Sequence, residues 1–173
     1  MDISHYIIGC QKLLKVLLIK GGRKMKIGIG CDHGGVVLKG AVIEAITEVG
    51  HDYYDYGTFG QESVDYPDYA EKVCKAIING EINKGILICG TGIGISIAAN
   101  KFKGIRCAHV TDEFQAQMSA EHNDANMIAL GGRVSDEISA KVMVKRFLET
   151  EFAGGRHKNR VDKILRIEEK NFN

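Results

Sequence analysis

Short apolar runs alternate with longer amphipathic segments along most of the chain. The first clear run, Lys26-Ile-Gly-Ile-Gly-Cys31, is typical of a short buried strand that opens into a glycine turn. Runs of this kind predict strands at residues 26–31, 51–56, 85–89, 105–110 and 127–131. Segments of helical period predict helices at residues 35–49, 67–79, 93–102, 112–121, 135–150 and 158–170. This alternation predicts an α/β fold of βαβ units around a parallel sheet.

The last predicted helix differs from the others because its apolar face is narrow. Val161, Ile164 and Leu165 follow the i, i+3, i+4 spacing of one helix face and are flanked by charged residues. Such a stripe is suited to docking on a partner surface, so we expect a C-terminal docking helix.

Residues 1–24 do not share the alternation. The stretch from Leu13 to Ile19 is apolar apart from Lys15, and it is far shorter than the roughly 20 residues that span a bilayer. We expect residues 1–24 to be an N-terminal extension, non-native or disordered, with Met25 as the natural start. Residues 25–173 should then form one domain.

Composition limits the kinds of binding partner and the cellular compartment that the sequence predicts. The 173 residues include 23 basic and 22 acidic side chains, a net charge of +1, so no overall field draws the chain to nucleic acid or to an anionic membrane. Any anion site must therefore be local. The five cysteines are odd in number and lack C-x-x-C spacing, which predicts a reducing, cytoplasmic environment.

The most informative segment is a strand that ends at Cys89 and passes through three glycines into a helix. It is not a dinucleotide fingerprint, because the glycines fall at Gly90, Gly92 and Gly94. The N–H groups of such a loop and the start of the helix favour negative charge, so Cys89 is a candidate thiolate base or nucleophile. The alternative is a buried strand cysteine without a chemical role.

Two polar residues follow the first strand. Asp32 is either the N-cap of the next helix or a carboxylate at the same rim as Cys89, because the carboxyl ends of parallel strands share one edge. The adjacent His33 can bind an anion or move a proton.

Other candidates lie at helix ends. Tyr66 opens the second helix, and His122 lies near the end of another, where a histidine often only interacts with the helix dipole. Arg156 and Arg160 are four residues apart, so in a helix they share a face that suits either solvent or a phosphate dianion. These histidines and Cys89 lack metal-ligand spacing, and we expect neither a metal nor a cofactor.

Taken in order, six segments of the chain resemble the type B ribose-5-phosphate isomerases. They are GCDHGG at 30–35, DYPDYA at 65–70, ILICGTGIGISIAANK at 86–101, EHNDAN at 121–126, GGR at 131–133 and GGRHKNRV at 154–161. The resemblance covers nearly all of residues 25–170. It implies a Rossmann-like three-layer sandwich with a five-stranded parallel sheet, and a homodimer with shared active sites that often forms a tetramer.

The resemblance also implies roles in interconverting ribose 5-phosphate and ribulose 5-phosphate through a cis-enediolate. Cys89 would move a proton between C2 and C1 with help from Thr91, His122 would open the furanose ring, and Asp32 would handle protons at the sugar hydroxyls. The substrate-binding residues would be His33, Tyr66, Gly90, Gly92, Gly94, Asn100, Asn123, Arg133, Arg156 and Arg160. In this set Asn100 lies near the enediolate, and His33 and the three arginines hold the phosphate.

Three alternatives stay open. Galactose-6-phosphate isomerase resembles the chain at the cysteine–glycine loop, but the segments around His122 and Arg156 favour the ribose enzyme. Allose 6-phosphate is an alternative six-carbon substrate. A noncatalytic receiver or nucleotide-binding module is a rival of another class, because α/β folds host many functions.

Overall fold

Five parallel strands form the centre of the protein in this computed structural model, which describes residues 24–171. The predicted N-terminal extension lies outside the described residues, apart from Lys24. The strands are β1 (Lys26–Cys31), β2 (Asp52–Asp55), β3 (Lys84–Cys89), β4 (Cys107–His109) and β5 (Met127–Gly131). They lie in the order β2-β1-β3-β5-β4, so the predicted parallel sheet is confirmed.

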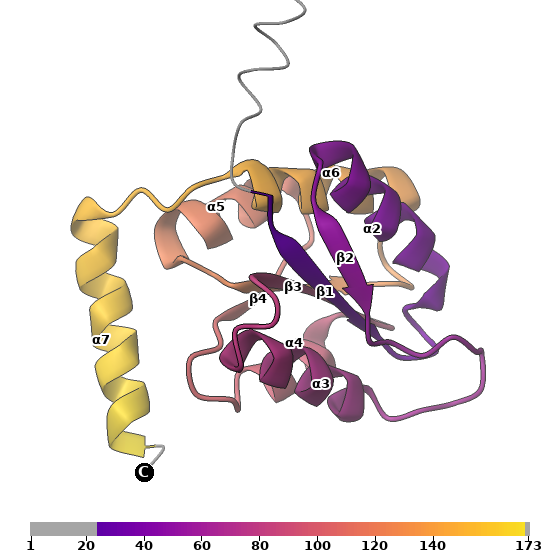
Figure 1. Cartoon of the computed structure of the whole chain (residues 1–173), viewed down its shortest axis with the longest axis horizontal. Helices are drawn as coiled ribbons and strands as arrows, with labels where there is room; N and C mark the ends of the chain where they lie inside the picture. Colours follow the sequence, from indigo (N-terminus) through magenta and orange to yellow (C-terminus); the bar gives the residue numbers. More distant parts are fainter. Residues whose placement is uncertain (1–23, 172–173) are drawn as a thin grey trace, which may run out of the picture.

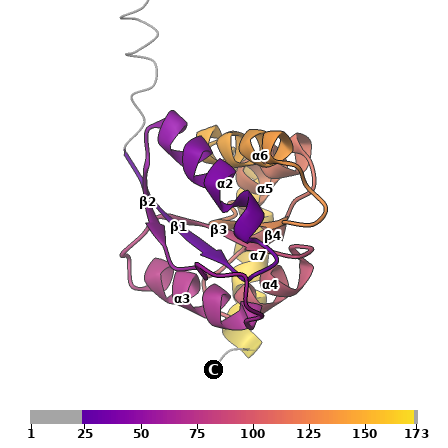
Figure 2. The ribbon, with the colours of Figure 1, turned by 90° about the vertical axis from the view of Figure 1, so that its right-hand side faces the viewer.

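Helices cover both faces of this sheet and make three layers (Figure 1). The helices are α2 (Val36–Val49), α3 (Tyr66–Ile78), α4 (Ile93–Ala99), α5 (Glu113–Asn123), α6 (Glu137–Glu149) and α7 (Gly155–Asn171). In the view turned by 90°, helices α2, α5 and α6 lie on one face of the sheet, and α3 and α4 lie on the other face (Figure 2). Alternate residues of the central strands point into the two cores, as the period of a strand requires.

The central strands are aligned at their carboxyl ends. Cys31 pairs with Ile88, and Cys89 pairs with Gly131. The loops that follow β1, β3 and β5 therefore leave the sheet at the same edge, where open α/β sheets bind their ligands.

A buried ion pair holds the segment that follows β2. The Lys39 Nζ atom lies 3.0 Å from an Asp55 carboxylate oxygen, and it also donates to the carbonyl of Thr58. Asp55 accepts a second hydrogen bond, at 3.0 Å, from the N–H of Gly57. These contacts attach the loop to α2.

The C-terminal helix α7 stands at one side of the sheet (Figure 1). It buries only His157 and Val161, while Ile164 of its apolar stripe is 45% exposed and the nearby Ile167 is 62% exposed. Between residues 24 and 171, no helix combines the length and apolar character needed to cross a membrane.

Several elements are one or more residues shorter than predicted, and in two of them the displaced end lies beside the side chain of Asn100. Helix α4 ends at Ala99 instead of residue 102, and β4 begins at Cys107 instead of residue 105. The Asn100 amide donates to the Cys107 carbonyl at 2.7 Å, and the Cys107 N–H donates to the Asn100 carbonyl oxygen at 2.9 Å. This local side-chain competition with regular structure is hard to anticipate from a pattern of apolar residues.

Candidate active site

Three loops meet at the carboxyl edge of the sheet. The N–H of Gly132, after β5, donates to the Cys89 carbonyl at 2.8 Å, and the N–H of Arg133 donates to the Gly90 carbonyl at 2.9 Å. The loop after β1 packs against the same turn, because a Cβ atom on Gly132 would lie 2.2 Å from the Gly34 carbonyl oxygen. Only glycine permits so close an approach of two backbones.

Cys89 is the last residue of β3 and faces the turn that follows it. Its Sγ atom accepts a hydrogen bond from the Gly92 N–H at 3.1 Å. Gly92 has a φ of +78°, a backbone conformation that turns this N–H back toward the strand end. A donated N–H is an interaction that stabilises negative charge on a sulfur atom.

The thiols of the other three described cysteines are in a different environment. Burial raises the pKa of Cys31 to about 11 and that of Cys74 to about 12, and it also raises the pKa of Cys107. These three thiols remain protonated near neutral pH. Among the four, Cys89 is the one that stands at the junction of the loops.

Asp32 is buried next to this junction. It is 6% exposed, and its Oδ1 atom has no hydrogen-bond partner within the described residues. The alternative that Asp32 is an N-cap is wrong, because α2 begins at Val36 and its N-cap is Gly35. The orphaned oxygen is enclosed by protein atoms, so the carboxylate lies at this edge without a donor to its Oδ1 atom.

His33, Tyr66 and Arg133 surround the same edge. His33 Nδ1 accepts the N–H of Val64 at 3.2 Å, so a neutral His33 ring carries its proton on Nε2. A Cβ atom on Gly94 would lie 2.7 Å from the Tyr66 ring, and one on Gly90 would lie 3.4 Å from the Arg133 guanidinium carbon. The aromatic ring and the cation therefore lie directly on the glycine loop that also contains Thr91.

A second group of predicted residues lies at the opposite edge of the sheet. Helix α5 starts after the end of β4 and finishes just before β5, so His122 and Asn123 lie at the amino edge. Arg156 and Arg160 are in the first two turns of α7, close to that edge, since the N–H of Ala153 donates to the Glu121 carbonyl at 2.9 Å. Figure 1 shows α7 on the side away from the strand arrowheads.

The predicted site is therefore split within one chain. Cys89, Thr91, Asp32, His33, Tyr66 and Arg133 form a carboxyl-edge group. His122, Asn123, Arg156 and Arg160 form an amino-edge group. Asn100 belongs to neither, because its amide is bonded to Cys107 as described above, and it lies at the C-terminal end of α4.

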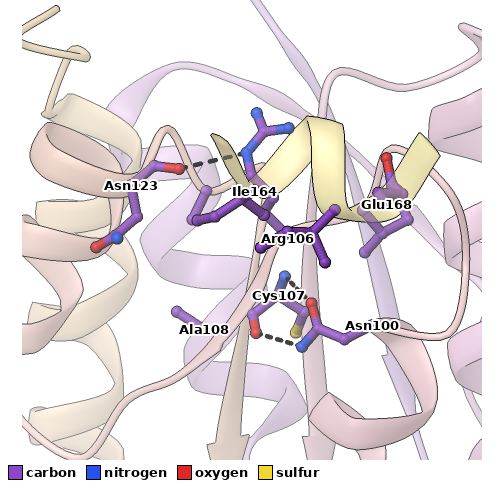
Figure 3. Close-up of a pocket in the computed structure, with 10 residues that line it drawn as sticks. Asn100, Arg106, Cys107, Ala108, Asn123, Ile164 and Glu168 are labelled. Atoms are coloured by element: carbon purple, nitrogen blue, oxygen red, sulfur yellow. Dashed lines mark hydrogen bonds between the residues drawn. The ribbon is translucent and has the colours of Figure 1, made fainter. Parts of the chain in front are cut away.

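A cavity of about 410 Å³ lies under α7, beside Asn100 (Figure 3). Its lining includes the apolar side chains of Ile105, Ala108, Ile164 and Ile167. None of the carboxyl-edge group lines it. We therefore place the chemistry at Cys89 and not in this cavity.

Two histidines near these groups were not assigned a role from the sequence. His109 Nε2 lies 2.9 Å from the Thr91 carbonyl oxygen, at the carboxyl edge. The His157 ring stacks on that of His122 with 3.9 Å between centroids. The GGRHKNRV segment contains His157, but only the packing of α7 against α5 reveals the stack. Within residues 24–171, no three or more His, Cys, Asp or Glu side chains are grouped as a metal site.

Known proteins are similar to this chain in both sequence and fold. The profile of the family described as Ribose/Galactose Isomerase matches residues 27–164. Ribose-5-phosphate isomerase B of Escherichia coli is 47% identical over 145 residues, which span 84% of this chain and 97% of that protein.

Solved structures of proteins with the same name also resemble this chain. Clostridium thermocellum ribose-5-phosphate isomerase B is 54% identical with a TM-score of 0.82, covering 84% of this chain and 99% of that one. The Mycoplasma genitalium enzyme with bound ribulose 5-phosphate is 38% identical with a TM-score of 0.79, covering 84% of this chain and 97% of that one. The chain therefore belongs to the ribose/galactose isomerase family, together with the type B ribose-5-phosphate isomerases.

Proposed function

We propose that this protein interconverts ribose 5-phosphate and ribulose 5-phosphate, with Cys89 as the base. The observation that carries the proposal is the hydrogen bond from the Gly92 N–H to Cys89 Sγ, at the edge where three loops meet. The E. coli relative is named for ribose 5-phosphate, and the M. genitalium relative was solved with ribulose 5-phosphate bound. Membership of an isomerase family argues against the receiver alternative.

The proposed reaction passes through a cis-enediolate. The Cys89 thiolate removes the proton from C2 of the open aldose, the C–H electron pair forms the C1–C2 double bond, and the charge moves to O1. A proton then passes from O2 to O1, the thiol returns its proton to C1, and the C2 carbonyl forms. Amides of the Gly90–Gly94 loop and the Thr91 hydroxyl would stabilise the charge on oxygen.

Asp32 is proposed to bind a sugar hydroxyl. A buried carboxylate oxygen without a hydrogen-bond donor costs free energy, and few such atoms occur in folded proteins. The Oδ1 atom is enclosed in this structure, so a substrate O–H that reached it after an adjustment of the loop that follows β1 would remove this cost. The same contact would orient the sugar beside Cys89, which ends the neighbouring strand β3.

We also infer that two copies of the chain form each active site. Ring opening by His122 and phosphate binding by Arg156 and Arg160 require these residues to reach the sugar held at Cys89. In one chain the two groups occupy opposite edges of the sheet. A symmetric dimer would bring the amino-edge group of one copy to the carboxyl-edge group of the other.

The first test compares Cys89→Ala with Cys107→Ala in an assay that converts ribose 5-phosphate to ribulose 5-phosphate. Cys89→Ala should lose nearly all turnover, while Cys107→Ala should keep most of it if its fold survives. Substantial turnover by Cys89→Ala would refute the assignment of the base. Wild-type kcat/KM should be higher on ribose 5-phosphate than on galactose 6-phosphate or allose 6-phosphate.

The second test addresses the shared site. Cys89→Ala and His122→Ala chains, each inactive alone, are co-expressed and purified together. Half of the random dimers would be mixed, and each mixed dimer would hold one intact site, so about a quarter of wild-type activity should return. No recovery in dimers shown to be mixed would mean that each site is built from one chain.

A further inference from the structure

The imidazole rings of His122 and His157 form a stacked pair that joins α5 to α7. Their centroids are 3.9 Å apart and their planes differ by 7°. His157 is 8% exposed, whereas 35% of the His122 side-chain surface is open to solvent. The buried ring is thus the fixed member of the pair, and the open ring is the one that a ligand can reach.

The contacts of His157 indicate that its ring is neutral. The Arg156 Nε–H, which is always protonated, points at His157 Nε2 from 3.4 Å, so Nε2 must offer a lone pair. The Nδ1 atom is buried with no partner in the described residues. Burial lowers the pKa of His157, and so do the nearby His122, Arg156 and Arg160, with only the Glu121 carboxylate acting in the opposite direction.

His122 has few other contacts that could orient it. Its Nε2 atom lies 3.7 Å from a Glu121 carboxylate oxygen, beyond hydrogen-bond distance, and that carboxylate also accepts a hydrogen bond from Gln117 at 2.9 Å. In the part of the chain that the structure describes, no hydrogen bond to the His122 ring is found. The stack on His157 is therefore a contact that restricts the plane of this ring where no hydrogen bond does.

The same buried ring also touches one of the residues proposed to hold the phosphate. Arg156 is adjacent to His157 on α7, and its guanidinium contacts the His157 edge while His122 covers the His157 face. A displacement of His157 would therefore disturb both the plane of His122 and the position of Arg156.

We propose that His157 is a positioning residue, a neutral aromatic platform that orients His122 for opening the sugar ring and aligns it with Arg156. The proposal rests on the ring-opening role proposed for His122. Transfer of a proton to a ring oxygen requires a group held within roughly 0.5 Å and 10–20° of its productive geometry. A flat partner at stacking distance supplies that constraint without competing for the proton.

The test uses two reactions that differ in whether a sugar ring must open. Ribose 5-phosphate is cyclic, whereas ribulose 5-phosphate cannot form a furanose because its C5 oxygen is esterified. Turnover of ribose 5-phosphate is measured beside one ring-independent readout, the exchange of the C1 hydrogen of ribulose 5-phosphate in heavy water followed by NMR. The variants are His157→Ala, His157→Phe and His122→Ala, and Lys158→Ala serves as a control for changes in the first turn of α7.

His157→Ala should lower kcat on ribose 5-phosphate by about 10- to 100-fold, as expected for a catalytic group displaced by about 1 Å. Its exchange of the C1 hydrogen of ribulose 5-phosphate should change little. His157→Phe, which keeps a flat ring but has no nitrogen atoms, should recover most of the loss, and Lys158→Ala should behave as wild type.

Several results would overturn the platform role. An equal loss in the ring-dependent and ring-independent reactions of His157→Ala would indicate a structural role, and failure of His157→Phe to recover would mean that the nitrogens are needed. Full activity of His157→Ala together with an inactive His122→Ala would refute the positioning role of His157 and leave the ring-opening role of His122 intact. Full activity of His122→Ala would refute the proposed ring opening, and the platform role with it.

Discussion

Replacing Gly92 by alanine should damage both the fold and the loop around Cys89. Gly92 has a φ of +78°, and a Cβ atom there would lie 2.7 Å from His109 Cδ2 and 2.9 Å from the Leu130 carbonyl carbon. The His109 ring can turn away, but the Leu130 backbone is part of a buried strand and cannot. The added methyl group would therefore push the Gly92 peptide, and its N–H, away from the Cys89 sulfur.

The size of the effect follows from two separate costs. A left-handed backbone costs a residue with a side chain about 1–2 kcal/mol. Forcing a methyl group into a filled space costs about 1–3 kcal/mol more. Gly104→Ala is the matched control, because Gly104 has a φ of +84° and a Cβ atom there would meet nothing within 4 Å. We expect Gly92→Ala to lower the free energy of unfolding by about 2–5 kcal/mol, and Gly104→Ala by only about 1–2 kcal/mol.

Urea unfolding of the two variants and the wild type measures the difference through the transition midpoints at constant m-value. Isomerase activity provides the second measurement, and it should fall in Gly92→Ala while persisting in Gly104→Ala. Equal destabilisation by the two substitutions would refute the steric part of the reasoning. Full activity of Gly92→Ala would show that the N–H donated to Cys89 is dispensable.

Three further outcomes are expected. Lys39→Met leaves a carboxylate buried without its cation and should cost about 3–5 kcal/mol in urea unfolding, whereas Lys141→Met, at a more exposed ion pair, should cost under about 1 kcal/mol. Arg156→Ala and Arg160→Ala should each raise KM for ribose 5-phosphate far more than for unphosphorylated ribose, and equal losses on both sugars would contradict phosphate binding. Because the pKa of His157 is lowered in the folded protein, the unfolded chain takes up this proton first as the pH falls. The free energy of unfolding should therefore decrease below about pH 6.5, and urea titrations at several pH values should show a smaller decrease in His157→Phe.

The three central strands could be predicted closely because they are buried on both faces of the sheet. All residues of β5 are buried, as are all but the first residue of β1 and β3, so a short apolar run is enough to locate each of them. The ends of α4 and β4 could not be predicted in this way. They depend on the Asn100 amide, whose partner lies seven residues away across a turn.

The candidate site was predictable residue by residue but not in its arrangement. The turn after Cys89 and the acid at Asp32 are visible as local patterns, and both lie at the predicted edge. The distance between Cys89 and His122 depends on the direction in which α5 crosses the sheet, and the His157 stack depends on how α7 packs. Neither of these can be obtained from spacing along the chain.

The amide of Asn100 has a further consequence for the solubility of the folded chain. Strand β4 forms one border of the sheet. Its hydrogen bonds with β5 include those made by the Arg106 carbonyl and the Val110 N–H, whereas the N–H and C=O of Cys107 face away from β5. Unpaired groups of this kind are templates on which a strand of another molecule can add. The Asn100 side chain bonds to both the N–H and the C=O of Cys107, as an added strand would. The opposite border of the sheet, β2, is only four residues long and has an aspartate at each end. Both borders thus carry features that oppose the edge-to-edge growth that leads from a native sheet to a fibril.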